Sequence, residues 1–515
     1  MMKPYKIFLT FLSILALIGL ISYFFPDEGI QLTPGLRVKL PSWSQLLEQE
    51  NQSYKDISNI VQNNMPVDTA APVIEDFPPG DVDKNTLSAS KDSTDTLQTE
   101  TLQPTAGWER TAGTNPLQYP DNNHEVLYPF FHSLQKLQHS EKLIRILHYG
   151  DSQIEGDRIS SYLRNQLQKK FGGAGIGLFP VVLPHKTNIS LKHSMSGNWK
   201  RLTIQDMDQE NFRHKRFGVL MSFSRFSPYY SHHQDEVHQA RLNIRSSPIA
   251  FNLASEYTRC RMFYGYNEEP FITKMTYGGE TTDADMKPPS KSLKEIKWEI
   301  PKSVEEFTIE FQGNHSPDIY GISLESEKGI AVDNIPLRGS NGTDFTKSDT
   351  VFFKTMLNKL NVKLVILHFG VNLVPVIRDS YQFYEERLYK ELRMFKSFNR
   401  DLAVIVMGVS DMSRKEGGQY ESYPNIPKIR DAQKNAAFRA GCAFWDTYRA
   451  MGGKNSMPSW VFADPPLGRK DFTHFTYEGS VVISKMFYKA LMRDYQKYIK
   501  DKQEKPSTNF KNDSR

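Results

Sequence analysis

Apolar residues from about position 116 onward fall into two alternating patterns. Some segments are short, nearly continuous apolar runs that predict buried strands of a parallel sheet, at 143–149, 362–368, 402–407 and 443–446. In others, apolar residues recur every three or four positions and predict one buried helix face, at 159–171, 384–395, 427–440 and 481–492. Strands and helices that alternate in this way predict an α/β fold with a mostly parallel sheet between two helical layers.

A different pattern interrupts this alternation between residues 188 and 330. Short segments there alternate apolar and polar residues, and turn residues such as Tyr277-Gly-Gly279 separate them. The clearest of these segments are 241–245, 294–300 and 306–311. Because no convincing amphipathic helix accompanies them, they predict an inserted antiparallel β-sandwich. The α/β domain would then consist of residues 116–187 and 331–495.

The N-terminal region begins with an uncharged run over residues 7–25, which is 19 residues long. At about 1.5 Å per residue, such a helix spans roughly 28 Å, close to the thickness of bilayer hydrocarbon. A signal peptide usually has a shorter apolar core and a small-x-small cleavage site, which this run lacks. We therefore expect residues 1–25 to form a single-pass anchor in the cytoplasmic membrane. Lysines precede the run and acidic residues follow it, so the positive-inside rule predicts a periplasmic location for the rest.

Residues 26–115 are expected to form a flexible extracytoplasmic linker. Within them, the stretch 66–104 is rich in Ser, Thr and Pro, and it contains eight acidic residues against two lysines. Such a composition buries too little apolar surface to offset the loss of chain entropy. A helix over 40–62 is expected before this stretch, and a disordered polar tail is expected over 496–515.

Composition excludes several classes of function. The net charge is +5, and no Lys/Arg block with interleaved aromatic residues occurs, so nucleic-acid binding has little support. The chain has two cysteines, Cys260 and Cys442, which lie far apart in sequence. This number excludes a disulfide framework and a cysteine-based zinc site. We expect two buried free thiols, and a single long-range disulfide is the alternative.

Polar residues with catalytic potential lie at the ends of predicted elements. The first strand ends in Gly150-Asp-Ser152, the second ends in Gly370-Val-Asn372, and Asp471-Phe-Thr-His474 precedes the last helix. Ligands of open parallel sheets bind beyond the carboxyl ends of the strands, so these residues are expected to meet at one edge. The Asp471 carboxylate could hold one imidazole nitrogen of His474 and leave the other to take a proton. Each motif alone is more typical of a capped turn or a surface pair, whereas their conjunction favours catalysis.

In this order, the blocks Tyr149-Gly-Asp-Ser-Gln153, Gly370-Val-Asn372 and Asp471-Phe-Thr-His-Phe475 resemble those of the GDSL/SGNH hydrolases. The family's third block usually has an aspartate after the asparagine, where this chain has Leu373. The resemblance covers about 140–187 and 331–495.

The remaining block of that family is a glycine. Arg338-Gly-Ser-Asn-Gly-Thr343 matches it best, with Gly342 as the expected backbone donor and Gly339 as the alternative. The resemblance implies a three-layer α/β/α fold and a serine esterase that needs neither a metal nor an organic cofactor. Ser152 would be the nucleophile, with His474 and Asp471 completing the triad. The N–H groups of Ser152 and Gly342 and the amide of Asn372 would form the oxyanion hole.

The order of anchor, linker, GDSL-type domain and β-insert is similar to that of bacterial peptidoglycan O-acetylesterases, which carry a carbohydrate-module-like β domain in the same place. This similarity implies removal of O-acetyl groups from an extracytoplasmic glycan, either peptidoglycan or another polysaccharide. One alternative is an O-acetyltransferase that moves acetyl groups onto a glycan, with a membrane-bound partner as acyl donor. A second is a non-catalytic cell-wall-binding protein with a vestigial triad.

Three further features have simpler interpretations. The glycine-rich segment 171–177 follows a helix and lacks the P-loop lysine, so it predicts a turn rather than a phosphate site. His148 and His368 lie in predicted strands, where a core or crevice position is expected rather than metal binding. Asp464 is a rival to Asp471 as the partner of His474, although a solvated loop position is expected for it.

Overall fold

The computed structural model describes residues 13, 17, 20, 21, 30–33, 36–38, 54–65, 115–185, 187–206, 214–229, 236–302 and 304–504. Its centre is a five-stranded sheet with the order β16-β3-β17-β18-β21, in which all neighbouring strands are parallel. The strands are β3 (Leu143–Gly150), β16 (Gly329–Pro336), β17 (Val362–His368), β18 (Ala403–Met407) and β21 (Ala443–Trp445). Four of them match the predicted apolar runs, which confirms the α/β fold with a parallel sheet. The sequence patterns missed β16.

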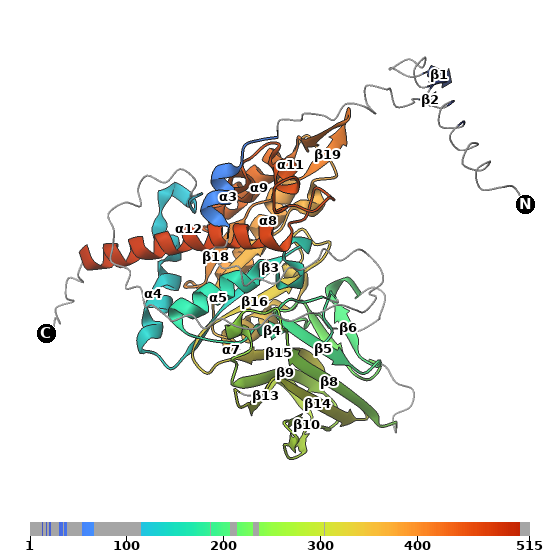
Figure 1. Ribbon diagram of the computed structural model, residues 1–515. Helices are drawn as coiled ribbons and strands as arrows, with labels where there is room; N and C mark the ends of the chain where they lie inside the picture. The colour runs from blue at the N-terminus through green and yellow to red at the C-terminus, as the bar shows by residue number, and fades with distance from the viewer. Residues whose placement is uncertain are drawn as a thin grey trace, which may run out of the picture.

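Helices cover both faces of this sheet (Figure 1). One layer contains α4 (Tyr128–Lys136), α5 (Ser160–Phe171) and α12 (Tyr477–Glu504), and the other contains α7 (Thr350–Lys359), α8 (Gln382–Phe398) and α9 (Ile426–Arg439). Successive strand residues face opposite layers. In β3, Ile144 and Ile146 face the first layer, whereas Leu147 and Tyr149 face the second. Shorter helices α10 (Thr447–Met451) and α11 (Ser456–Val461) precede α12.

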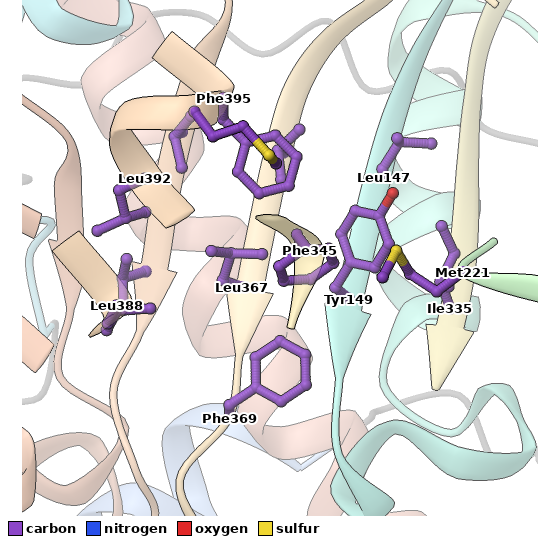
Figure 2. Packing of buried hydrophobic residues seen from close by; sticks show 14 of the residues in the cluster. Leu147, Tyr149, Met221, Ile335, Phe345, Leu367, Phe369, Leu388, Leu392 and Phe395 are labelled. Carbon is purple, nitrogen blue, oxygen red and sulfur yellow. The ribbon is translucent and has the colours of Figure 1, made fainter. Parts of the chain in front are cut away.

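The second layer is packed mainly by aromatic and leucine side chains. Figure 2 shows Tyr149 of β3 and Leu367 of β17 beside Phe345, Phe369 and Phe395. The ring centroids of Tyr149 and Phe345 are 4.9 Å apart, and those of Phe345 and Phe395 are 5.2 Å apart. This packing fixes the strands near their carboxyl ends, where the candidate catalytic residues begin.

Two antiparallel sheets pack face to face in the lower half of Figure 1, as predicted for the insert. Their orders are β11-β10-β14-β8-β5 and β13-β9-β15-β7-β6, with β12 beside β10 and β4 beside β15. The strands are β4 (Gly177–Phe179), β5 (Leu191–Met195), β6 (Lys200–Thr203), β7 (Ser222–Arg225), β8 (His238–Ser246), β9 (Arg259–Asn267), β10 (Phe271–Tyr277), β11 (Glu280–Thr281), β12 (Asp285–Lys287), β13 (Ser290–Glu299), β14 (Glu306–Gly313) and β15 (Asp318–Glu325). The two cysteines are free and buried, as expected.

The sandwich and the α/β layers share one apolar core. Phe223 and Tyr320 of the sandwich belong to the same buried cluster as Phe352 and Met356 of α7. The rings of Tyr320 and Phe352 are 4.6 Å apart. The sheet containing β15 is therefore covered on both faces, by the second sheet on one side and by the α/β body on the other.

A buried ion network also joins the sandwich to the parallel sheet. The guanidinium of Arg145 in β3 pairs with Glu325 of β15 and lies 2.5 Å from Asp333 of β16. Arg261 of β9 lies 2.7 Å from the other carboxylate oxygen of Glu325. Burial raises the pKa of the Asp333 carboxyl to about 6, although Arg145 acts in the opposite direction. Burial also acts to raise the pKa of Glu325, but the two arginines outweigh it and lower that pKa.

Two histidines are buried side by side at the carboxyl ends of β3 and β17. The rings of His148 and His368 are parallel within 1°, with centroids 5.9 Å apart. Nδ1 of His148 lies 2.8 Å from the Ser160 hydroxyl. Burial lowers the pKa of both imidazoles, that of His368 to about 4. Both side chains lie in the core, and the described part of the chain contains no group of three potential metal ligands.

Two expectations about the ends of the chain need correction. Residues 54–65 lie within the predicted flexible linker, yet α3 (Ser58–Asn64) packs on α12, where the Lys485 ammonium donates to the carbonyl of Met65 at 3.0 Å. The apolar side chains of Ile57, Ile60 and Val61 give this segment a buried face. The predicted tail from 496 is likewise helical as far as Glu504, because Tyr498 is buried. The helix α3 overlaps the end of the helix predicted over 40–62. Residues 40–53 and 505–515 lie outside the described ranges.

The predicted membrane location is also corrected. Within the described ranges, no helix combines the length and the apolar character needed to cross a bilayer. The long helix α12 has 28 residues, but charged side chains occur along its whole length. This finding overturns the predicted single-pass anchor and the periplasmic placement inferred from it. Most of the run 7–25 lies outside the described residues.

Replacement of Arg145 by methionine should destabilise the protein strongly. The substitution would leave Glu325 and Asp333 buried without their common cation, a change that typically costs about 3–5 kcal/mol. Urea unfolding at neutral pH measures the difference. Lys328→Met is the matched control, because the ion pair of Lys328 with Glu141 is solvent-exposed and should contribute little. Equal effects of the two substitutions would contradict the proposed importance of the network.

The buried histidine pair predicts a loss of stability on acidification. The folded-state pKa of His368 lies near 4, below the ordinary value of 6.5, so protons bind preferentially to the unfolded chain between these values. Stability is therefore complete above pH 6.5 and falls as the pH decreases toward 4. Between pH 6.5 and 4, the free energy of unfolding of the wild type should fall more steeply than that of His368→Phe, by up to about 1.4 kcal/mol per pH unit.

Denaturant titrations at pH 7, 6 and 5 test this difference, with the exposed His139→Phe as the control. Parallel pH dependences for the wild type and His368→Phe would show that the burial of this imidazole has no such effect.

Candidate active site

Ser152 lies directly beyond the carboxyl end of β3, at the start of a 3₁₀ helix (Ser152–Asp157). The chain passes close to β17 just before it. A Cβ on Gly150 would lie 2.8 Å from the carbonyl oxygen of His368, so only glycine fits between the two strands without a shift. This close approach lets the chain turn at the sheet edge and leaves the half-buried Ser152 at the rim.

The structure brings together the three predicted triad residues. The hydroxyl oxygen of Ser152 lies 2.8 Å from Nε2 of His474, although the two residues are 322 positions apart. Nδ1 of His474 lies 2.8 Å from Oδ2 of Asp471. This order of hydroxyl, imidazole and carboxylate is the one needed to take a proton from the serine. Asp464 is exposed, and the imidazole is oriented by Asp471 instead.

The loop that carries Asp471 and His474 is held by its own hydrogen bonds. Oδ1 of Asp471 accepts the backbone N–H groups of Thr473 and His474, both at 2.9 Å. Burial acts to raise the pKa of the Asp471 carboxyl, but the hydrogen bonds from His474 and Thr473 outweigh it and lower the pKa to about 2. The carboxylate is therefore ionised at any ordinary pH and can stabilise an imidazolium. Phe472, which lies between Asp471 and His474 in the chain, is buried and has a positive φ of 53°.

Asp151 joins the serine turn to the asparagine loop, a role that the sequence patterns did not reveal. Its buried carboxylate accepts the backbone N–H groups of Gln153 at 3.1 Å, Gly370 at 3.0 Å and Val371 at 3.3 Å. Burial raises its pKa to about 6, against the opposing effect of these hydrogen bonds. The end of β3 and the start of the loop with Asn372 thus share one acceptor.

The two other predicted oxyanion donors meet at Ser340. The side-chain amide of Asn372 donates to the Ser340 carbonyl at 3.0 Å, and the N–H of Gly342 donates to the Ser340 hydroxyl at 3.0 Å. The asparagine amide has a second N–H, whereas the single N–H of Gly342 is already engaged. The role of Ser340 was not predicted, because hydrogen bonds between loops leave no periodic signal.

Of the two candidate glycines, Gly342 is the one whose surroundings require glycine. Its φ is +74°, and a Cβ there would lie 2.6 Å from the ring of Phe369. Gly339 also has a positive φ, but a Cβ on it would meet nothing within 4 Å. The loop that carries both residues is tied to β3 by a backbone hydrogen bond from Leu337 to Gly150 of 2.7 Å.

The site is open to solvent. The side chains of His474 and Asp471 are 25% and 46% exposed, and Asn372 is also exposed. A cavity of about 450 Å³ lies elsewhere, beside Gly172 and Gly329 at the amino end of β16, and none of the predicted site residues lines it. An open rim of this kind admits a bulky substrate that carries a small reacting group.

Comparison with known proteins supports the fold. No protein-family model matches the chain, and no curated protein matches it by sequence. A solved structure of a peptidoglycan O-acetylesterase superposes with a TM-score of 0.56 at 20% identity, covering 73% of this chain and 98% of that one.

Two further solved structures overlap a smaller part of the chain. One is a putative GDSL-like lipase from Parabacteroides merdae, with a TM-score of 0.25 at 13% identity, covering 31% of this chain and 72% of that one. The other is an acetyl xylan esterase, with a TM-score of 0.25 at 14% identity, covering 32% and 81%. The solved structure with a TM-score of 0.56 shows that this chain shares its fold with a peptidoglycan O-acetylesterase, in line with the fold that the sequence predicts.

Proposed function

We propose that the protein is a serine esterase that removes O-acetyl groups from a glycan, either peptidoglycan or another polysaccharide. The observation that carries this proposal is the 2.8 Å contact between the Ser152 hydroxyl and Nε2 of His474, with Nδ1 of the same ring 2.8 Å from Asp471. A hydroxyl, a base and an orienting carboxylate in this arrangement perform nucleophilic acyl transfer.

The proposed reaction proceeds in two steps. Nε2 of His474 takes the Ser152 proton as the serine oxygen attacks the ester carbonyl, and Asp471 stabilises the resulting imidazolium. The imidazolium then protonates the sugar oxygen as it leaves, so the acetyl group remains on Ser152. In the second step His474 activates a water molecule in the same way, and acetate departs.

The negative charge of the tetrahedral intermediate would be held by three N–H donors. These are the backbone N–H of Ser152, the backbone N–H of Gly342 and the free N–H of the Asn372 amide. The Ser340 hydroxyl accepts the N–H of Gly342 at 3.0 Å, so Gly342 can contribute only when this hydrogen bond is released. A rotation of the Ser340 side chain would release it.

Two observations support a polymeric acetyl ester as substrate. The proposed catalytic groups lie on an open rim, which suits an ester attached to a bulky chain. The structure with a TM-score of 0.56 is that of a peptidoglycan O-acetylesterase, and it covers 73% of this chain. We further propose that the sandwich is a carbohydrate-module-like insert that contacts the glycan.

Purified wild type should release acetate from p-nitrophenyl acetate and from O-acetylated peptidoglycan, and Ser152→Ala should not. A fluorophosphonate probe should label Ser152 in the folded wild type. Absence of both labelling and turnover would contradict the proposal and favour a non-catalytic binding protein.

The same assay separates an esterase from a transferase. With a non-acetylated glycan added as acceptor, an esterase still delivers most acetyl groups to water as free acetate. Faster accumulation of acetylated acceptor than of acetate would identify an O-acetyltransferase instead.

Replacement of Asn372 by alanine should lower kcat by about 10²–10³-fold, the usual effect of removing one oxyanion donor. KM should change little, because the donor acts mainly on the charge that develops in the transition state. Asn243→Ala is the matched control: its amide bonds to the Thr308 hydroxyl on the sandwich, remote in the fold from β17. A kcat for Asn372→Ala within twofold of the wild type would exclude this residue from the oxyanion hole.

A further inference from the structure

The residue that follows the nucleophile makes three hydrogen bonds to distant segments. The side chain of Gln153 is buried, with 1% exposure. Its Nε2 donates to the carbonyl of Thr473 at 2.7 Å and to the hydroxyl of Ser410 at 3.0 Å. Its Oε1 accepts the backbone N–H of Phe475 at 3.4 Å. One amide therefore holds the main chain on both sides of His474.

Arg158 forms a second connection between the same two segments. Its guanidinium donates to the carbonyl of Ser152 at 2.8 Å and to the carbonyl of Phe475 at 3.0 Å. Its Nε donates to the carbonyl of Glu155 at 2.9 Å, within the same turn. The planar fork of arginine suits this role, since it addresses several carbonyl oxygens in a fixed geometry.

The triad itself does not determine where the base lies relative to the nucleophile. Asp471 belongs to the same loop as His474, so its bonds to the ring and to the backbone N–H of His474 orient the base but do not join it to the Ser152 turn. The single contact of Ser152 with His474 breaks and reforms during the proposed reaction. Bonds that persist must therefore set the 2.8 Å separation, and those of Gln153 and Arg158 connect the two backbones directly.

We infer that Gln153 and Arg158 are positioning residues that hold His474 at proton-transfer distance from Ser152. This inference rests on the proposed esterase function. Neither side chain touches the reacting atoms, and both act through the loop that carries the base. A displacement of about 1 Å in such a geometry lowers turnover by about 10²-fold, so their loss should reduce kcat more than it changes KM.

A buried glutamine elsewhere provides a matched control. Gln168 in α5 is 2% exposed, and its Nε2 donates to the carbonyl of Gly175 at 2.9 Å, remote from the catalytic rim. Gln168→Leu and Gln153→Leu remove the same kind of buried amide. Both should lower the melting temperature, but only Gln153→Leu should lower kcat, by about 10²-fold with KM within about threefold.

Gln153→Glu adds a readout that a general loss of stability does not reproduce. An ionised carboxylate cannot donate to the Thr473 carbonyl, whereas a protonated carboxyl can. The kcat of Gln153→Glu divided by that of the wild type, with both measured at the same pH, should therefore rise as the pH falls. Arg158→Lys keeps the charge but removes the planar guanidinium that donates to several carbonyl groups. It should lower kcat with little change in KM, as expected for Gln153→Leu.

Crystal structures of the wild type and Gln153→Leu make the test independent of turnover. A separation of Ser152 Oγ from His474 Nε2 that lengthens beyond hydrogen-bonding range in the variant supports the inference. An unchanged separation, or a kcat ratio equal to that of Gln168→Leu, overturns it. Failure of the proposed function is recognised separately, as a wild type that neither releases acetate nor labels at Ser152.

Discussion

The buried carboxylate of Asp151 is the interaction on which the candidate site depends most. A parallel sheet brings the strand ends to the same edge. Beyond the last backbone hydrogen bond between two strands the chains separate, so other contacts must hold their loops together. Here the last bond is from the N–H of Asp151 to the carbonyl of His368, at 3.2 Å. The side chain of the same aspartate then accepts the N–H groups of Gly370 and Val371. The single residue Asp151 thus fixes both the end of the strand pairing and the relative position of the loops that carry Ser152 and Asn372.

The catalytic rim is also tied to the body of the sandwich. The hydroxyl of Tyr149, three residues before Ser152, donates to the carbonyl of Val219 at 2.6 Å, and Arg145 on the same strand pairs with Glu325 of β15. Side chains of both parts lie in one apolar cluster. The sandwich is therefore packed against the strand that delivers Ser152, not attached by loops alone. Any glycan bound to the sandwich would lie in a fixed orientation to the rim.

The parts of the fold and of the candidate site that could be predicted from sequence are those that depend on residues close together in the chain. Apolar runs and helical periodicity are local, and they predicted four of the five parallel strands. The strand β16 was missed because Asp333 and Asn334 interrupt its apolar run, and Asp333 is buried with its partner Arg145 on the neighbouring strand. Ser152, Asp471 and His474 were predicted from the short motifs in which they lie. The hydrogen bond from Asn372 to the Ser340 carbonyl joins two distant loops, and Gln153 and Arg158 bond to the main chain beside His474. Such contacts leave no sequence pattern, so only coordinates reveal them.

One donor of the proposed oxyanion hole is engaged in a hydrogen bond, which has a consequence for the proposed chemistry. The N–H of Gly342 is bonded to the Ser340 hydroxyl, a neutral acceptor. A ground-state ester carbonyl is also neutral, so it gains little by displacing that hydroxyl, since the net free energy of such an exchange is small. An oxyanion differs, because hydrogen bonds to a charged acceptor are roughly twice as strong. Exchange therefore becomes favourable as charge develops, and Gly342 would stabilise the transition state more than the bound substrate, which is the condition for an interaction to raise kcat.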